Sequence, residues 1–248
     1  MSILRKVWHR LFRNREDIIA IRRTVEDASR FLSELSTFVH ERLSSPEAID
    51  DLVKTGWRRS LPNVALTWNV EMVGAEFLGH VKAACGSRFA RIVEIGPGYG
   101  RVLKTLLASD VQFDEYCGLD ISPETTRYLA STFKDARLRF TNADFLKQAI
   151  PAPVQLIYSS AVFLHLYPDI TPALRWCHGT LADGGYVCFD VPRGGRRYID
   201  AGWGLYVREY VEPELRDLVA SAGYSSCRVM EEREFEPGIP GLFVAARK

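Results

Sequence analysis

Acidic residues stand at the ends of three successive predicted strands. Glu94 lies near the end of the first strand, Asp120 ends the second, and Asp144 follows the third. Parallel strands end at one edge of a sheet, so we expect these carboxylates to gather there. The second can accept two hydrogen bonds from a ribose diol, and the third can accept from an adenine amino group. Each alone is more often a helix cap or a solvated loop residue, but together they predict a site for an adenosine-type ligand.

A glycine-rich turn follows the first of these strands, where residues 91–100 read Arg-Ile-Val-Glu-Ile-Gly-Pro-Gly-Tyr-Gly. Such a turn lets the chain reverse sharply and lets a ligand lie against the backbone without a Cβ between them. The residue three positions after Gly98 is Arg101, so the G-x-G-x-x-G spacing of a dinucleotide site is absent. The turn therefore predicts a bound ligand but not a dinucleotide pyrophosphate.

Short β-branched or aromatic runs alternate with helical segments after Arg91, which is typical of βαβ units. Strands are predicted near 91–95, 115–119, 137–140, 154–159, 185–190, 226–231 and 241–246, and helices near 99–109, 123–133, 170–182 and 212–222. The last two strands are separated by a segment with two Pro and two Gly, too short for a helix, so the final strand should enter antiparallel. The sequence predicts an α/β fold with a doubly wound, seven-stranded, mostly parallel sheet.

The chain before this sheet is predicted to be helical, with an N-terminal extension over 1–62 and the sheet domain over 63–248. Residues 3–12 predict a basic amphipathic helix that either packs on protein or lies on an anionic membrane surface. Apolar residues then recur in steps of three and four, at Ile18, Ile21, Val25, Ala28, Leu32, Leu35 and Val39. This seam predicts a homodimer through the N-terminal helices, with residues 46–84 as an alternative partner within the chain.

Composition and charge exclude several classes of protein. The 32 Lys and Arg against 31 Asp and Glu leave a net charge of +1, unlike a general nucleic-acid binder. The five Cys form no C-x-x-C pair, which argues against a disulfide framework or a zinc ribbon. The uncharged stretch 148–168 is interrupted by three Pro, so we expect no stable membrane insertion. No secretory signal is apparent, and a cytoplasmic location is expected.

The motifs resemble those of the class I S-adenosylmethionine-dependent methyltransferases over roughly residues 65–248. The resemblance rests on segments 93–100, 118–124, 142–145, 154–166 and 181–187. It implies a Rossmann-like methyltransferase fold with S-adenosyl-L-methionine bound above the first strand.

The resemblance also implies roles for individual residues. Glu94 would hold the methionine amino group through water or backbone, while Asp120 would bind the ribose and Asp144 the adenine amino group. Ile121 would pack on the adenine, and Phe145 would cover that ring. The full set expected to bind the cofactor is Glu94, Gly96, Pro97, Gly98, Gly100, Asp120, Ile121, Asn142, Asp144, Phe145 and Ser160. The usual Asp of the fourth strand is Gln155 here, which affects only a structural contact.

The end of the fourth strand bears on the methyl acceptor. Methyltransferases that act on nucleobases and exocyclic amines carry an Asn or Asp-Pro-Pro-aromatic motif there, and metal-dependent O-methyltransferases carry carboxylates. This chain has Ser159-Ser160-Ala161-Val162 instead. We therefore expect a small-molecule substrate, no nucleic acid and no metal, although Asp169 and Asp190 remain as candidate metal ligands.

His165 is the candidate catalytic residue, because it follows the fourth strand beside the expected position of the methyl group. A histidine with an ordinary pKa of about 6.5 suits a base that removes a proton from a hydroxyl. The alternative is that His165 only caps the following turn.

A long loop over 191–210 is predicted to act as a lid at the edge of the site. Its aromatic residues can stack on a sugar or an aromatic acceptor, and its arginines can hold a phosphate or carboxylate. The alternative is a solvated arginine loop anchored by core aromatics. The predicted substrate-binding set is Tyr99, Arg193, Arg196, Trp203, Tyr206 and Tyr210.

We therefore expect an enzyme, a methyltransferase that methylates a hydroxyl oxygen of a saccharide or other small metabolite. The alternatives are N-methylation of a small molecule, or an inactive cofactor-binding scaffold that acts through the helical extension.

Overall fold

The computed structural model describes residues 46–58, 70–151, 153–199, 205–236 and 239–248. It divides the chain into two units, Met1–Ile49 and Asp50–Lys248. The helix predicted over 3–12, the seam predicted over 18–39 and Trp203 lie outside the described residues. The boundary predicted after residue 62 stays a prediction. Helix α2 (Pro46–Arg58) belongs to the second unit from Asp50 onward.

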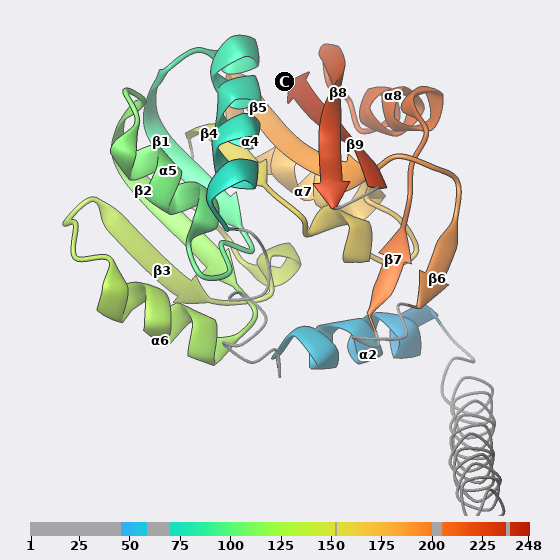
Figure 1. The fold of residues 1–248 in the computed structure, drawn as a ribbon, viewed down its shortest axis with the longest axis horizontal. Coiled ribbons are helices and arrows are strands. Elements are labelled where there is room, and N and C mark those ends of the chain that lie inside the picture. Colours follow the sequence, from blue (N-terminus) through green and yellow to red (C-terminus); the bar gives the residue numbers. More distant parts are fainter. Residues whose placement is uncertain (1–45, 59–69, 152, 200–204, 237–238) are drawn as a thin grey trace, which may run out of the picture. The chain divides into compact units, whose positions relative to one another are not determined.

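The second unit is built on a seven-stranded sheet in the order β3-β2-β1-β4-β5-β9-β8 (Figure 1). The strands are β1 (Arg88–Ile95), β2 (Gln112–Asp120), β3 (Leu138–Asn142), β4 (Val154–Ser159), β5 (Leu181–Pro192), β8 (Ser226–Glu236) and β9 (Ile239–Arg247). Neighbours from β3 to β5 are parallel, whereas β9 is antiparallel to both β5 and β8. The predicted doubly wound sheet with a reversed final strand is confirmed.

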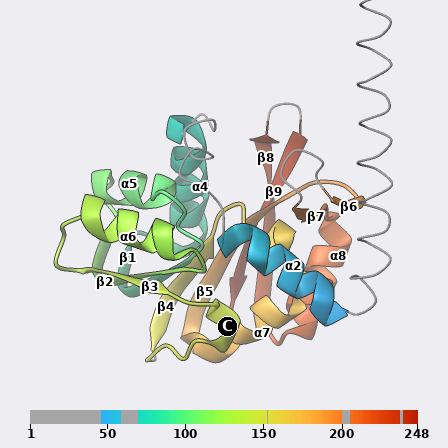
Figure 2. The same cartoon turned by 90° about the horizontal axis from the view of Figure 1, so that it is seen from below.

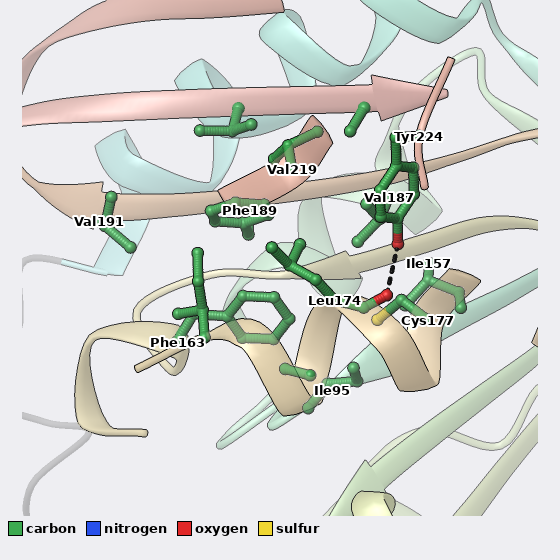
Figure 3. Close-up of a cluster of buried hydrophobic side chains, with 14 of the residues drawn as sticks. Ile95, Ile157, Phe163, Leu174, Cys177, Val187, Phe189, Val191, Val219 and Tyr224 are labelled. Carbon is green, nitrogen blue, oxygen red and sulfur yellow. Dashed lines mark hydrogen bonds between the residues drawn. The ribbon is translucent and has the colours of Figure 1, made fainter. Parts of the chain in front are cut away.

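Helices cover both faces of the sheet, which is why most residues of the central strands β1 and β4 are buried. These are α4 (Val70–Cys85), α5 (Arg101–Ala108), α6 (Pro123–Thr132), α7 (Thr171–Thr180) and α8 (Glu212–Ser221). Residues of α4 and α5 form one buried cluster with the sheet, and residues of α7 and α8 form another. Figure 3 shows part of the second cluster, where Tyr224 Oη donates to the carbonyl oxygen of Leu174 at 2.9 Å.

The loop predicted over 191–210 contains two short antiparallel strands, and its role as a lid stays a prediction. Its strands are β6 (Arg197–Ile199) and β7 (Tyr206–Arg208). The buried Arg208 fixes β7, because its Nη1 donates to the carbonyl oxygen of Pro168 at 2.6 Å and its Nη2 contacts Glu214. The hairpin is thereby held against the segment that follows β4.

From Asp50 onward, α2 lies across the carboxyl ends of the parallel strands (Figures 1 and 2). Asp50, Val53, Lys54 and Trp57 repeat at helical spacing, so they share one face of this helix. All four line the cavity described next.

Candidate active site

The glycine turn after β1 adopts a backbone that favours glycine. Gly96 and Gly98 have φ angles of 66° and 54°, in the left-handed region. A Cβ on Gly96 would lie 2.4 Å from Cγ2 of Val162, so no larger residue fits without rearrangement. A Cβ on Gly98 would meet nothing within 4 Å. The backbone at Gly98 therefore borders open space in the cavity, where a ligand can approach it.

Asp120 ends β2 and is held by backbone amides. Its Oδ1 accepts from the Ser122 amide at 2.8 Å, and its Oδ2 accepts from the Gly98 amide at 3.2 Å. Burial raises the pKa of Asp120 to about 6, although these two hydrogen bonds oppose the rise. An ionised carboxylate can accept about four hydrogen bonds, so Asp120 retains capacity for ligand donors. Asn142 supports this strand end, because its Nδ2 donates to the backbone oxygen of Asp120 at 3.0 Å.

Glu94 is buried beside the turn, with 2% of its surface exposed. The hydroxyls of Tyr116 and Tyr158 both donate to its Oε2, the latter at 2.8 Å. Burial raises the pKa of Glu94 to about 7, while the two tyrosine hydrogen bonds and the positive charge of Arg101 oppose the rise. The site therefore contains a carboxylate that titrates near neutrality and that a cationic ligand would ionise.

One cavity of about 260 Å³ brings most of the predicted site together. The predicted residues that line it are Glu94, Gly96, Pro97, Gly98, Tyr99, Asp120, Ile121, Asp144, Phe145, Ser160 and His165. Gly100 and Asn142 do not line it. Gly100 instead precedes α5, where an added Cβ would lie 2.6 Å from the ring of Phe133.

His165 lies in the 3₁₀ helix η2 (Phe163–His165) and is mostly buried, with 8% exposed. Its Nδ1 lies 2.7 Å from the backbone oxygen of Tyr206 in the hairpin. A carbonyl oxygen can only accept, so Nδ1 carries the proton of this hydrogen bond. In the neutral ring, Nε2 is therefore the nitrogen with the lone pair, which is the form that a general base requires.

A second polar network lies at the end of β4. Ser160 Oγ accepts from Arg101 Nη2 at 2.8 Å and donates to Asp190 Oδ2 at 2.7 Å. The Ala161 amide also donates to Asp190, and Ala161 has a left-handed φ of 58°. Burial raises the pKa of Asp190, while the charge of Arg101 and these hydrogen bonds oppose the rise. The network fixes the start of the segment that carries His165.

Helix α2 contributes residues to the cavity whose position could not be predicted from the sequence. Lys54 Nζ lies 2.9 Å from Asp144 Oδ2 and 2.7 Å from Asp50 Oδ2. Burial lowers the pKa of Lys54, but its interactions with these two carboxylates outweigh burial and raise that pKa. Trp57 packs on His165, with ring centroids 4.7 Å apart. Helical spacing over 46–58 was the available signal, but it does not say which part of the sheet the helix meets.

Most of the residues predicted to bind substrate lie outside the cavity lining. Arg193 pairs with Glu231, and Arg196 pairs with Glu209. The hydroxyl of Tyr206 donates to the carbonyl oxygen of Pro168, and Tyr210 is fully buried. Among the described residues of the loop, Tyr206 meets the site through its backbone oxygen, and of the described residues in the predicted set Tyr99 lines the cavity.

Within the described ranges, no group of three or more His, Cys, Asp or Glu side chains is placed to hold a metal ion. Across the same ranges, no helix is long and apolar enough to span a membrane.

Comparison with known proteins places this fold among methyltransferases. Residues 93–187 match a family model described as a methyltransferase domain. The 1,6-didemethyltoxoflavin-N1-methyltransferase of Burkholderia thailandensis is 22% identical with a TM-score of 0.69, over 83% of this chain and 91% of that chain. A SAM-dependent methyltransferase of Leishmania major is 18% identical with a TM-score of 0.67, over 85% and 89%. The N-methyltransferase NodS of Bradyrhizobium japonicum, in complex with S-adenosyl-L-homocysteine, is 16% identical with a TM-score of 0.57, over 80% and 99%.

At these identities the structural likeness shows the fold. No curated protein matches the chain.

Proposed function

We propose that this chain is a class I S-adenosylmethionine-dependent methyltransferase and that it methylates a hydroxyl oxygen of a small molecule, with His165 as the general base. The observation that supports this reaction is the hydrogen bond between His165 Nδ1 and the Tyr206 carbonyl. It fixes the tautomer whose Nε2 accepts a proton, in a ring that lines the same cavity as Asp120 and the glycine turn.

The residues present fit S-adenosyl-L-methionine, the cofactor of this family. The backbone at Gly98 borders open space, and the buried Asp120 retains acceptor capacity for a ribose diol. Glu94 would interact with the positively charged methionine end, and Ile121 and Phe145 would pack against the adenine. When bound, S-adenosyl-L-methionine supplies a methyl group on a sulfonium, which passes to the acceptor oxygen as the carbon–sulfur bond breaks.

His165 completes the reaction by handling the proton. As the bond from the acceptor oxygen to the methyl carbon forms, the hydroxyl proton moves to Nε2 and is later released to solvent. The protein also supplies alignment, because an in-line displacement depends on how the reacting atoms are held. The buried network of Ser160 and Asp190 provides such rigidity before η2 begins.

His165→Ala tests the base. We expect cofactor affinity to stay nearly unchanged and turnover to fall by roughly 10²–10⁴-fold, the usual contribution of general base catalysis. Turnover is followed as the mass shift of one methyl group in a panel of hydroxylated metabolites, and affinity by calorimetry. A loss of less than about fivefold would assign His165 to turn capping instead.

N-methylation is the second candidate, since two of the structurally similar proteins are N-methyltransferases by name. A neutral amine already presents its lone pair and needs no base for the transfer itself. Amine acceptors are therefore tested beside the hydroxylated metabolites. Methylation of an amine, with little loss of turnover in His165→Ala, would favour this second function.

A further inference from the structure

Helix α2 contacts His165 through Trp57, and this contact indicates which methyl acceptors the cavity can bind. Trp57 is half-buried and lines the cavity, and its ring centroid lies 4.7 Å from that of His165. The two planes are tilted by 58°, so His165 does not stack flat on the indole. A planar ring that packs against Trp57 would hold its substituents beside the imidazole.

Apolar side chains line the cavity together with Trp57. Among the described residues these include Val53, Val162 and Leu166. Several polar residues of the described lining already pair with one another: Ser160 Oγ bonds to Arg101 and Asp190, and Lys54 pairs with Asp50 and Asp144. A saccharide carries hydroxyls around its ring, and each one that is buried without a hydrogen-bond partner opposes binding. An aromatic ring with few polar substituents matches this surface better.

Acidity favours the same class of acceptor. An imidazole has an ordinary pKa of about 6.5, and an aromatic hydroxyl such as that of tyrosine has one of about 10. An aliphatic hydroxyl is far less acidic than an aromatic one and is closer to water in its acidity. A histidine base is therefore better matched to an aromatic hydroxyl than to a sugar hydroxyl.

Trp57 is held in place by the same helix face. Lys54, one turn earlier, has 15% of its side chain exposed and bridges Asp50 to Asp144. The bridge joins α2 to the segment that follows β3, and Trp57 is thereby positioned before any acceptor binds.

We propose that Trp57 is a specificity-determining residue that selects acceptors in which the reacting hydroxyl is borne by a planar aromatic ring. This inference rests on the proposed function and narrows its substrate class. Trp57 supplies an apolar platform for the ring, and His165 takes the proton from the hydroxyl that the ring presents.

The test compares two sets of probes in the full chain: phenol, 2-naphthol and 8-hydroxyquinoline against methyl glucoside and inositol. We expect methylation of aromatic probes only. Trp57→Leu should raise the KM for those probes by about 2- to 12-fold, the equivalent of losing an aromatic contact of about 0.5–1.5 kcal/mol. Trp57→Phe should keep the KM within about twofold of the parent, because it retains an aromatic face. Thr55→Ala, on the same helix but outside the cavity lining, is the matched control.

Binding separates this inference from the proposed function. Calorimetry with each probe on protein saturated with S-adenosyl-L-homocysteine needs no turnover, and aromatic affinity should weaken in Trp57→Leu while cofactor affinity is retained. Methylation or binding of the saccharide probes in preference to the aromatic ones would overturn the inference, as would aromatic binding unchanged in Trp57→Leu or absent altogether. Failure of the cofactor itself to bind would instead overturn the proposed function.

Discussion

Glu94 combines deep burial with contact to the ligand cavity. Two tyrosine hydroxyls donate to one of its oxygens, and its pKa is raised to about 7 by burial. Parallel pairing explains the arrangement, because Tyr158 lies opposite Glu94 in the register of β1 and β4. The sequence indicated the carboxylate but not the tyrosines, since register between distant strands cannot be derived from spacing alone.

This pKa predicts how cofactor affinity depends on pH. Below pH 7, Glu94 in the protein without ligand is increasingly protonated. A cationic ligand interacts best with the ionised carboxylate, so its binding requires that this proton be released. The Kd for S-adenosyl-L-methionine should therefore rise as pH falls below 7, by up to about tenfold per pH unit, and level off above pH 7. Asp120, with a pKa raised to about 6, should steepen the dependence at lower pH.

Calorimetric titrations between about pH 5.5 and 8.5 measure this profile. Glu94→Gln is the control, because glutamine can still accept hydrogen bonds from the tyrosines but does not titrate. Its Kd should be higher than that of the parent and should change little with pH around pH 7. A parent Kd that stays constant from about pH 6 to 8 would contradict the assignment.

At the scale of elements, the strands and helices after Arg91 were predictable because their apolar runs alternate with turn signals. The hairpin β6–β7 was not, since its short strands carry arginines and aromatics without an alternating apolar pattern. The position of α2 could not be predicted from spacing either. Lys54 and Trp57 precede the sheet in sequence, and only tertiary packing brings them to Asp144 and His165.

The Lys54–Asp144 ion pair should hold α2 on the sheet. Lys54→Met retains helix propensity but removes the charge that neutralises two carboxylates. We expect backbone amides of residues 50–58 to exchange with solvent about fivefold faster, equivalent to about 1 kcal/mol for a partly exposed pair, with β1 and β4 unchanged. Asp51→Asn, an exposed position on the same helix, serves as the control. Unchanged exchange across α2 would mean that apolar contacts alone hold this helix.

For the whole molecule, the oligomeric state remains a prediction of the sequence. The seam from Ile18 to Val39 spans about three heptads and lies outside the described residues. If it pairs with a second copy, light scattering should give a dimer for the full chain and a monomer for Leu32→Glu. A monomer for both, with unchanged melting, would leave the seam to pack within its own chain.

We propose that the carboxyl edge of the sheet binds S-adenosyl-L-methionine with Asp120 as the ribose ligand. Calorimetry of the parent and of Asp120→Ala with S-adenosyl-L-methionine and S-adenosyl-L-homocysteine tests it most directly. We predict one site per chain and a loss of about 1–3 kcal/mol in Asp120→Ala, because buried ligand hydroxyls lose a charged acceptor. No binding of either compound at about millimolar concentration, or the same Kd in both proteins, would contradict the claim.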